Sequence, residues 1–255
     1  MDHRLVCHLE RGRPVPVIRL DGVLDVETTP AIRTAVLSGF VDGPNAVVVD
    51  LAGVMVRDDI ALTVFPTLAR AAASFHGGEL LLCAATEPVV GQMRNLAILK
   101  YVPMFATRAE ALAHAAQLRT PRLFRLHLPP SPPACVTARR LVVRACGRWG
   151  LGTMADRAAL VTTELVANAV NHARTPSVLT VSLRTRHLHV AVEDGCPVLP
   201  HRRGLDDPYV PEGRGLLVIE AFSSAWGCVP RPGGKVVWVT MRRPPPPPAA
   251  VSHPN

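Results

Sequence analysis

The chain has 255 residues, of which 48% are hydrophobic and 19% charged, a balance that excludes a largely disordered protein. Its length suits two domains, and no apolar run reaches the length of a membrane span. The charged residues that follow Met1 are unlike a secretory signal, so we expect a cytoplasmic protein. The six cysteines show neither a metal-ligand spacing nor a disulfide framework.

The net charge of +8 comes from the second half of the chain. Up to Thr120 there are 11 Lys+Arg and 12 Asp+Glu, and from Pro121 onward there are 17 and 8, so the halves carry −1 and +9. A basic half favours a polyanionic ligand such as a nucleotide, or an acidic protein partner. Direct nucleic-acid binding is not expected, because the arginines are dispersed and the 4% of aromatic residues offer no stacking platform.

Strand and helix patterns alternate regularly in the first half. Strands are predicted at residues 15–20, 46–51 and 79–83, and helices at 27–37, 60–75, 88–99 and 107–118. Asp21-Gly22 reads as a turn after the first strand, and Pro66 should kink the second helix. Regular alternation predicts an α/β layer with helices packed on the sheet.

Residues 22–25, 47–54 and 57–62 together carry a resemblance to a known family. Over residues 4–118 the chain resembles a STAS domain, the module of anti-sigma-factor antagonists. In that family a turn of sequence Asp-Ser-Ser/Thr-Gly-Leu supplies the serine that a partner kinase phosphorylates. Asp58 matches the aspartate, and Asp59 takes the place of that serine. Asp59 is then a permanent phosphoserine mimic, or else one of the two aspartates simply caps the next helix.

The second half begins after a boundary that we predict at residues 119–121, so the domains are 4–118 and 119–243. A Pro-rich tail at 244–255 is expected to be disordered. Strands are predicted at 123–128, 178–183, 188–193 and 236–241, and helices at 134–149 and from the N-cap Asp156 onward. This order predicts an α+β domain. His187 and His189 alternate on one strand and are expected to face solvent.

The helix after Asp156 holds a row of polar residues. Glu164, Asn168 and His172 recur every four residues at the edge of an apolar face that includes Leu165. A cleft could use a carboxylate, an amide and an imidazole placed in such a row. The alternative is three half-buried polar side chains that form local hydrogen bonds.

Two further segments follow this helix. Residues 190–197 form a strand that ends in the turn Asp194-Gly195-Cys196-Pro197, and residues 212–217 contain two glycines, Gly213 and Gly215, that open a helix. With the Glu164 helix, these segments resemble the N, G1 and G2 boxes of the ATPase fold shared by gyrases, heat-shock chaperones and sensor histidine kinases. Over residues 122–242 the likeness is to its anti-sigma-factor serine/threonine kinases of actinobacterial type, which implies a histidine-kinase-like ATPase α/β sandwich.

The resemblance implies a role for each box. Glu164 would be the general base, and Asn168 would offer its amide oxygen to Mg2+. Asp194 would accept the amino group of adenine, with Gly195 letting the base approach closely.

The third box would complete the nucleotide site. Gly213, Arg214, Gly215 and Leu216 would bring backbone N–H groups and a helix N-terminus to the phosphates of ATP. Residues 198–211 would form a mobile lid. Lys235 stands where the family usually has the threonine of Gly-Gly-Thr, and it would touch a phosphate or, as we favour, sit at a hairpin.

These features predict a fused partner-switching regulator of transcription. The second domain would transfer the γ-phosphoryl group of ATP, with Mg2+, to a serine or threonine of a separate STAS antagonist. The alternative is a non-catalytic ATP-binding module that sequesters a sigma factor or an antagonist. Neither model involves a membrane or direct contact with nucleic acid, and both leave a homodimer open.

Overall fold

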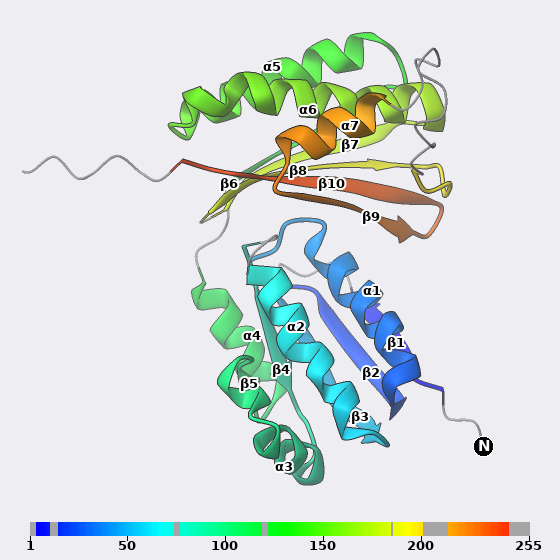
Figure 1. The fold of residues 1–255 in the computed structure, drawn as a ribbon, viewed down its shortest axis with the longest axis vertical. Helices are drawn as coiled ribbons and strands as arrows, with labels where there is room; N and C mark the ends of the chain where they lie inside the picture. The colour runs from blue at the N-terminus through cyan, green and yellow to red at the C-terminus, as the bar shows by residue number, and fades with distance from the viewer. Residues whose placement is uncertain are drawn as a thin grey trace, which may run out of the picture.

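Two stacked layers of sheet and helix make up the part of the chain that can be described (Figure 1). The computed structural model describes residues 4–10, 15–73, 77–118, 122–184, 186–200 and 214–244. The predicted fold class, an α/β layer followed by an α+β layer, is confirmed. The lid beyond Pro200 and the tail from residue 245 lie outside the described residues, and the boundary at 119–121 stays a prediction for the same reason.

The first sheet has the order β1-β2-β3-β4-β5, antiparallel between β1 and β2 and parallel elsewhere. Its strands are β1 (Val6–Glu10), β2 (Val17–Leu24), β3 (Ala46–Val56), β4 (Glu79–Cys83) and β5 (Met104–Phe105). Its helices are α1 (Thr29–Phe40), α2 (Val64–Ala71), α3 (Glu87–Asn95) and α4 (Arg108–Gln117). The apolar runs of β3 and β4 are buried because helices cover both faces of this sheet.

Two local predictions for this sheet were wrong. Asp21 and Gly22 do not form a turn, because β2 continues through them with a register shift against β3 and Gly22 at a φ of +119°. Pro66 does not kink an α-helix, because residues 59–63 form a 3-10 helix and α2 begins only at Val64. Pro66 therefore lies in the first turn of α2, where its missing N–H is not needed.

The second sheet is antiparallel throughout, in the order β6-β7-β8-β10-β9. Its strands are β6 (Arg122–Leu128), β7 (Ser177–Leu183), β8 (His187–Asp194), β9 (Ala225–Arg231) and β10 (Gly234–Arg242). Helices α5 (Pro133–Arg148), α6 (Ala155–Asn168) and α7 (Arg214–Phe222) cover one of its faces. Asp156 is not the N-cap of α6, because the helix begins one residue earlier and Met154 holds that position.

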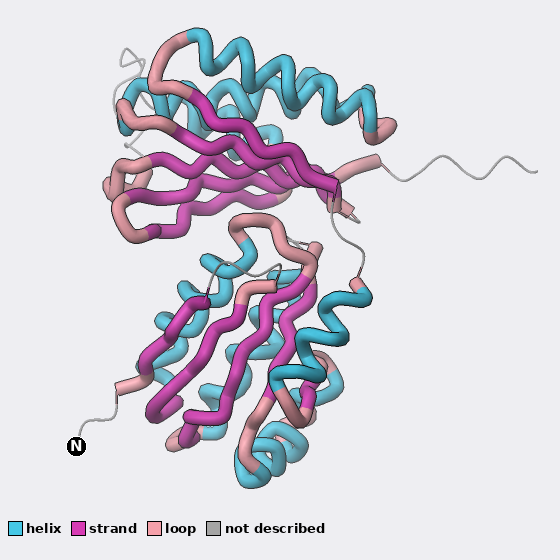
Figure 2. The backbone as a smooth tube through the Cα atoms, turned by 180° about the vertical axis from the view of Figure 1, so that it is seen from behind, coloured by secondary structure: helices cyan, strands magenta, loops and turns pink. Residues whose placement is uncertain are grey.

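The opposite face of the second sheet rests on the first domain (Figure 2). Val41, just after α1, belongs to one buried cluster with Ala191, Val229, Val236 and Trp238 of the second sheet. The two domains are therefore in contact through an apolar patch. It is the sheet face that carries no helices.

Polar contacts surround this patch. The carboxylate of Asp42 accepts hydrogen bonds from Arg125 and Arg231, each at 3.0 Å. Arg184 donates to the carbonyl oxygen of Pro44 at 3.0 Å, and burial lowers the pKa of its guanidinium to about 10. The loop between α1 and β3 is thus fixed to the second sheet at several points.

The first domain also changes the surroundings of the two strand histidines. His187 and His189 were expected to face solvent, but both are buried. The ring of His189 stacks on that of Trp238, with centroids 6.2 Å apart. The prediction was wrong because it treated this sheet face as open, whereas the first domain covers it.

No helix among the described residues is long and apolar enough to cross a membrane.

Candidate active site

A cavity of about 480 Å3 lies on the helix-covered side of the second sheet. Its apolar wall is formed by Leu165 of α6, Val192 of β8 and Val237 of β10. Polar groups reach it from three separate parts of the chain, among them Asn168, Asp194 and Lys235. An apolar cleft with a few converging polar groups is the usual form of a small-ligand site.

Helix α6 places Asn168 in the wall of this cavity and Glu164 one turn earlier, beside Gly215, which also lines the cavity. Glu164 and Asn168 are half-buried, as a row at the edge of an apolar face requires. A Cβ atom added to Gly215 would lie 2.8 Å from Glu164 Oε2 and 3.6 Å from Asn168 Oδ1. The glycine of the third motif is therefore packed against the polar pair of the first.

The third member of the row is displaced. After Asn168 the helix widens into a π turn at Ala169–Ala173, which ends at Arg174 in the left-handed conformation. His172 lies in that turn, so it is not on the straight row that a regular α-helix would give. Its exposed side chain still lines the cavity.

The turn after β8 is fixed by side chains. The backbone N–H of Cys196 donates to Asp194 Oδ1 at 2.9 Å, which closes a tight Asx turn. The N–H of Gly195 donates to the hydroxyl of Thr175 at 2.8 Å. Gly195 faces Thr175 and does not line the cavity, whereas Asp194 does. Thr175 was not predicted, because no sequence pattern links it to this turn.

Lys235 forms an ion pair with Asp194 at the base of the cavity. Its Nζ donates to Asp194 Oδ1 at 2.9 Å and to the carbonyl oxygen of Cys196 at 3.0 Å. The side chains of the lysine and the aspartate are 9% and 4% exposed. Lys235 does follow the β9–β10 hairpin turn, as favoured from the sequence, but its side chain points inward.

The register of the sheet explains this pair. Lys235 lies directly opposite Asp194 in the antiparallel ladder of β10 and β8. Its neighbour Gly234 passes so close to β8 that an added Cβ would lie 2.0 Å from the carbonyl oxygen of Asp194. The contact between Lys235 and Asp194 could be predicted only from the register of β8 against β10. No pattern in the sequence sets that register.

The other predicted site residues are more dispersed. Arg214 and Gly215 begin α7, and Leu216 lines the cavity, whereas Gly213 and the side chain of Arg214 lie outside what the structure describes. Asp59 lies in the first domain and accepts a hydrogen bond from Gln92 at 2.7 Å.

Asp58, the neighbour of Asp59, has a local structural role. Its side chain caps the 3-10 helix by accepting from the N–H of Ile60 at 3.0 Å. The capping alternative therefore holds for Asp58. Asp59 lines neither the small cavity nor the larger groove between the domains.

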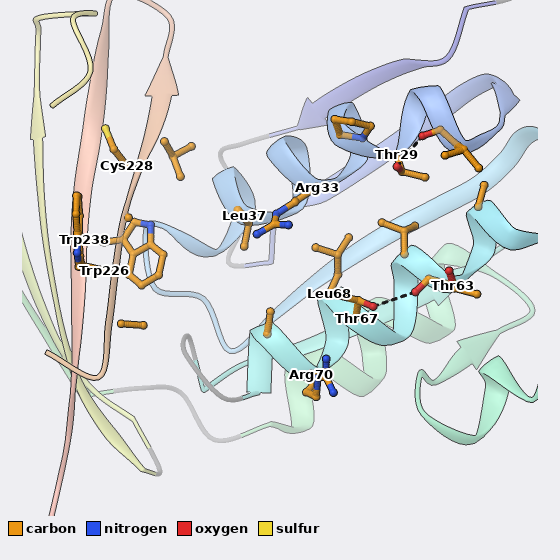
Figure 3. A pocket seen from close by; sticks show the side chains of 18 of the residues that line it. Thr29, Arg33, Leu37, Thr63, Thr67, Leu68, Arg70, Trp226, Cys228 and Trp238 are labelled. Atoms are coloured by element: carbon orange, nitrogen blue, oxygen red, sulfur yellow. Dashed lines mark hydrogen bonds between the residues drawn. The ribbon is translucent and has the colours of Figure 1, made fainter. Parts of the chain in front are cut away.

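That larger groove, of about 920 Å3, lies between α1, α2 and the edge strand β9 (Figure 3). Arg33 and Arg70 are the charged residues among those that line it, beside apolar side chains such as Leu37, Leu68 and Trp226. Among the described residues that line the groove there is no carboxylate, whereas the smaller cavity has Asp194 in its wall and Glu164 beside its lining residue Gly215. The smaller cavity is therefore the better candidate for chemistry, although the groove is larger.

The residues of the smaller cavity suit a purine nucleotide. The apolar wall fits a base, and the carboxylate of Asp194 fits an exocyclic amino group. The absence of a Cβ at Gly215 leaves room for a ligand beside Asn168. The amide oxygen of Asn168 is a suitable ligand atom for Mg2+.

The second domain is thus a two-layer sandwich, with an antiparallel sheet, helices on one face and a cavity with a buried carboxylate between them. Residues 128–241 match the family model of the histidine kinase-like ATPase domain, and residues 8–111 match that of the STAS domain. The chain thus carries an N-terminal STAS domain joined to a C-terminal histidine kinase-like ATPase domain.

Solved structures similar to this chain include two anti-sigma factor antagonists. The protein from Mycobacterium paratuberculosis is 22% identical over 44% of this chain and 95% of its own, with a TM-score of 0.39. The protein from Thermotoga maritima is 19% identical over the same shares, 44% and 95%, also with a TM-score of 0.39. The histidine kinase AdeS of Acinetobacter baumannii is 16% identical over 86% of this chain and 96% of its own, at 0.29. Among curated proteins, none matches this chain.

Proposed function

We propose that this chain is a cytoplasmic partner-switching regulator whose second domain is an ATP-dependent protein serine/threonine kinase. The observation that carries the proposal is the meeting of three distant segments at one cavity, which is lined by Asn168, Asp194 and Gly215. Glu164 lies one helical turn before Asn168, and its carboxylate is beside Gly215. These are the segments that resemble the three boxes of the ATPase fold. Their convergence favours a nucleotide site over a helix that merely buries polar residues.

Each residue has a chemical task in this proposal. Asp194 accepts the exocyclic amino group of the base, and Asn168 offers its amide oxygen to Mg2+. ATP supplies the γ-phosphoryl group when bound. The carboxylate of Glu164 orients the hydroxyl of the acceptor protein and takes its proton as the oxygen–phosphorus bond forms and ADP leaves.

The substrate in this proposal is a serine or threonine on a separate STAS-domain antagonist. The STAS domain of the chain itself is not the substrate, because Asp59 has no hydroxyl at the position of the phosphoacceptor. Glu164 and Asn168 also lie on the helix side of the second sheet, and the first domain lies against the other side (Figure 1). The net charge of +9 in the second half favours acidic partners.

A second candidate is a module that binds ATP without transferring phosphate and sequesters a sigma factor or an antagonist. Lys235 favours it, because an ammonium group stands where the related kinases have a threonine, so the site departs from theirs while it keeps a donor and an acceptor for a base. Asp59 favours it as well, since a fixed negative charge would make the STAS domain a permanent bait.

The two candidates separate in one experiment on the full chain. Glu164→Ala should abolish transfer from labelled ATP to a panel of STAS antagonists while sparing nucleotide binding in calorimetry. Asp194→Asn should weaken binding itself. Full transfer by the Glu164→Ala variant would exclude the base assignment. Binding of ATP without any transfer by the unmodified chain would favour the sequestering module.

A further inference from the structure

The hydrogen bonds of the ion pair in the cavity can be counted. Asp194 Oδ1 accepts from Lys235 Nζ at 2.9 Å and from the N–H of Cys196 at 2.9 Å. A carboxylate oxygen has about two lone-pair positions, so Oδ1 is filled. Among the described residues Oδ2 accepts no hydrogen bond, which leaves it as the acceptor of this carboxylate for a ligand.

The lysine has one donor left by the same count. An ammonium group carries three hydrogens, and those of Lys235 reach Asp194 Oδ1 and the carbonyl oxygen of Cys196. Lys235 and Asp194 both line the cavity. The base of the cavity therefore presents one N–H donor beside one carboxylate acceptor, held in place by Gly234 and the β8–β10 ladder.

We propose that Lys235 reads the base directly: its third N–H donates to N1 of adenine while Asp194 Oδ2 accepts from the 6-amino group. This inference rests on the nucleotide site proposed above and names its specificity-determining residue. The Watson–Crick edge of adenine offers an amino donor beside a ring-nitrogen acceptor, which complements the acceptor and donor of the pair. The threonine of the related kinases would offer a neutral hydroxyl at this position, so the charged donor belongs to this chain.

The filled Oδ1 excludes one mode of guanine binding. A carboxylate captures guanine best when both of its oxygens accept, one from N1–H and one from the 2-amino group. In this cavity Asp194 Oδ1 already accepts two hydrogen bonds. Asp194 therefore cannot bind guanine through both of its carboxylate oxygens. The remaining oxygen and N–H donor complement the 6-amino group and N1 of adenine, but they would also complement N1–H and O6 of guanine, so GTP is compared directly in the test.

The test is a cycle of two ligands and two proteins, with GTP on the unmodified chain and ATP on Lys235→Thr as further arms, all read by calorimetric binding to the full chain with Mg2+. ATP is compared with 1-deaza-ATP, in which a C–H replaces N1, on the unmodified chain and on Lys235→Met. We expect the unmodified chain to bind ATP at least about tenfold more tightly than 1-deaza-ATP, as for a charge-assisted hydrogen bond. In Lys235→Met this preference should fall to about threefold or less.

The outcomes distinguish a failure of the proposed role of Lys235 from a failure of the proposed nucleotide-binding function. Equal affinity of the unmodified chain for ATP and 1-deaza-ATP overturns the role of Lys235 but leaves the nucleotide site standing, and this comparison needs no variant that has to fold. GTP binding as tight as ATP overturns the base assignment. Tighter ATP binding by Lys235→Thr would show that the lysine obstructs the site. If the folded, unmodified chain binds neither nucleotide, the proposed function itself fails.

Discussion

The contact between Gly215 and Glu164 allows a sharp test of the proposed catalytic site. Gly215→Ala adds a Cβ that would lie 2.8 Å from Glu164 Oε2, a distance shorter than Cβ atoms adopt in proteins. Gly215 lies in the first turn of α7, where alanine suits the helix better than glycine does. The fold should therefore persist, and the flexible carboxylate of Glu164 should move instead.

The size of the effect follows from the distance. To reach an ordinary contact of 3.4 Å, the carboxylate must retreat by about 0.6 Å from the added methyl group. Misplacement of a catalytic group by about 1 Å can cost on the order of a hundredfold in rate. We expect phosphoryl transfer to fall roughly ten- to a hundredfold. Affinity for ATP should also fall, because the added methyl group takes space beside Asn168, but by less than the rate, because Asp194 and the apolar wall are not displaced.

The assay is transfer from labelled ATP to a STAS antagonist, with calorimetric ATP binding in parallel. Gly147→Ala is the matched control: it lies in α5 of the same domain, and an added Cβ there would meet nothing within 4 Å. This control should transfer at the unmodified rate. Full activity of Gly215→Ala would refute the reasoning, because it would mean that the position of Glu164 does not matter for transfer.

Two further predictions concern the contact between the domains. Asp42→Ala leaves Arg231, whose side chain is 7% exposed, without its carboxylate partner. The free energy of unfolding in urea should therefore fall by about 2 kcal/mol. Most of this loss should come from the pair with Arg231, because Arg125 is exposed. Burial, followed by the charges of Arg242 and Arg186, lowers the pKa of His187 below 6.5, so the folded state resists its protonation. Stability should therefore decline as pH falls below 6.5, and His187→Asn should reduce that decline when unfolding is compared at pH 7.5 and 5.5; an unchanged pH dependence would contradict this.

The parts of the fold that the sequence predicted are those where one strong local pattern decides. The apolar run of β3 favours a buried strand, and the i, i+4 spacing around Leu165 favours a helix. Both elements are present in the structure. Short or atypical strands were not predicted. β9 contains Pro230 and lies at the sheet edge, and β1 is half exposed, so neither shows a clear alternation.

The site was predictable only as far as motifs reach. Glu164 and Asn168 could be placed on the rim of a helix from their spacing, and the structure brings Gly215 to them. The ion pair of Lys235 and Asp194 depends on a strand register between residues far apart in the sequence, which no local pattern fixes. The burial of the strand histidines depends on the other domain, so single-domain reasoning could not supply it.

The position of the domain contact bears on how such a fusion could regulate a partner. An internal complex of substrate and kinase would place Asp59 at the cavity beside Glu164. Instead the first domain covers the sheet face that has no helices, with Val41 in the shared apolar cluster, and Asp59 lines neither the cavity nor the groove. The cavity thus lies on the side of the sheet that faces away from the first domain, where the proposed partner in trans would bind. The STAS domain is fixed to the back of the same sheet, through β8 and β10, whose ends supply Asp194 and Lys235. Any partner that shifts the first domain would therefore act on the strands that form the base of the cavity, which gives the fusion a physical route for coupling.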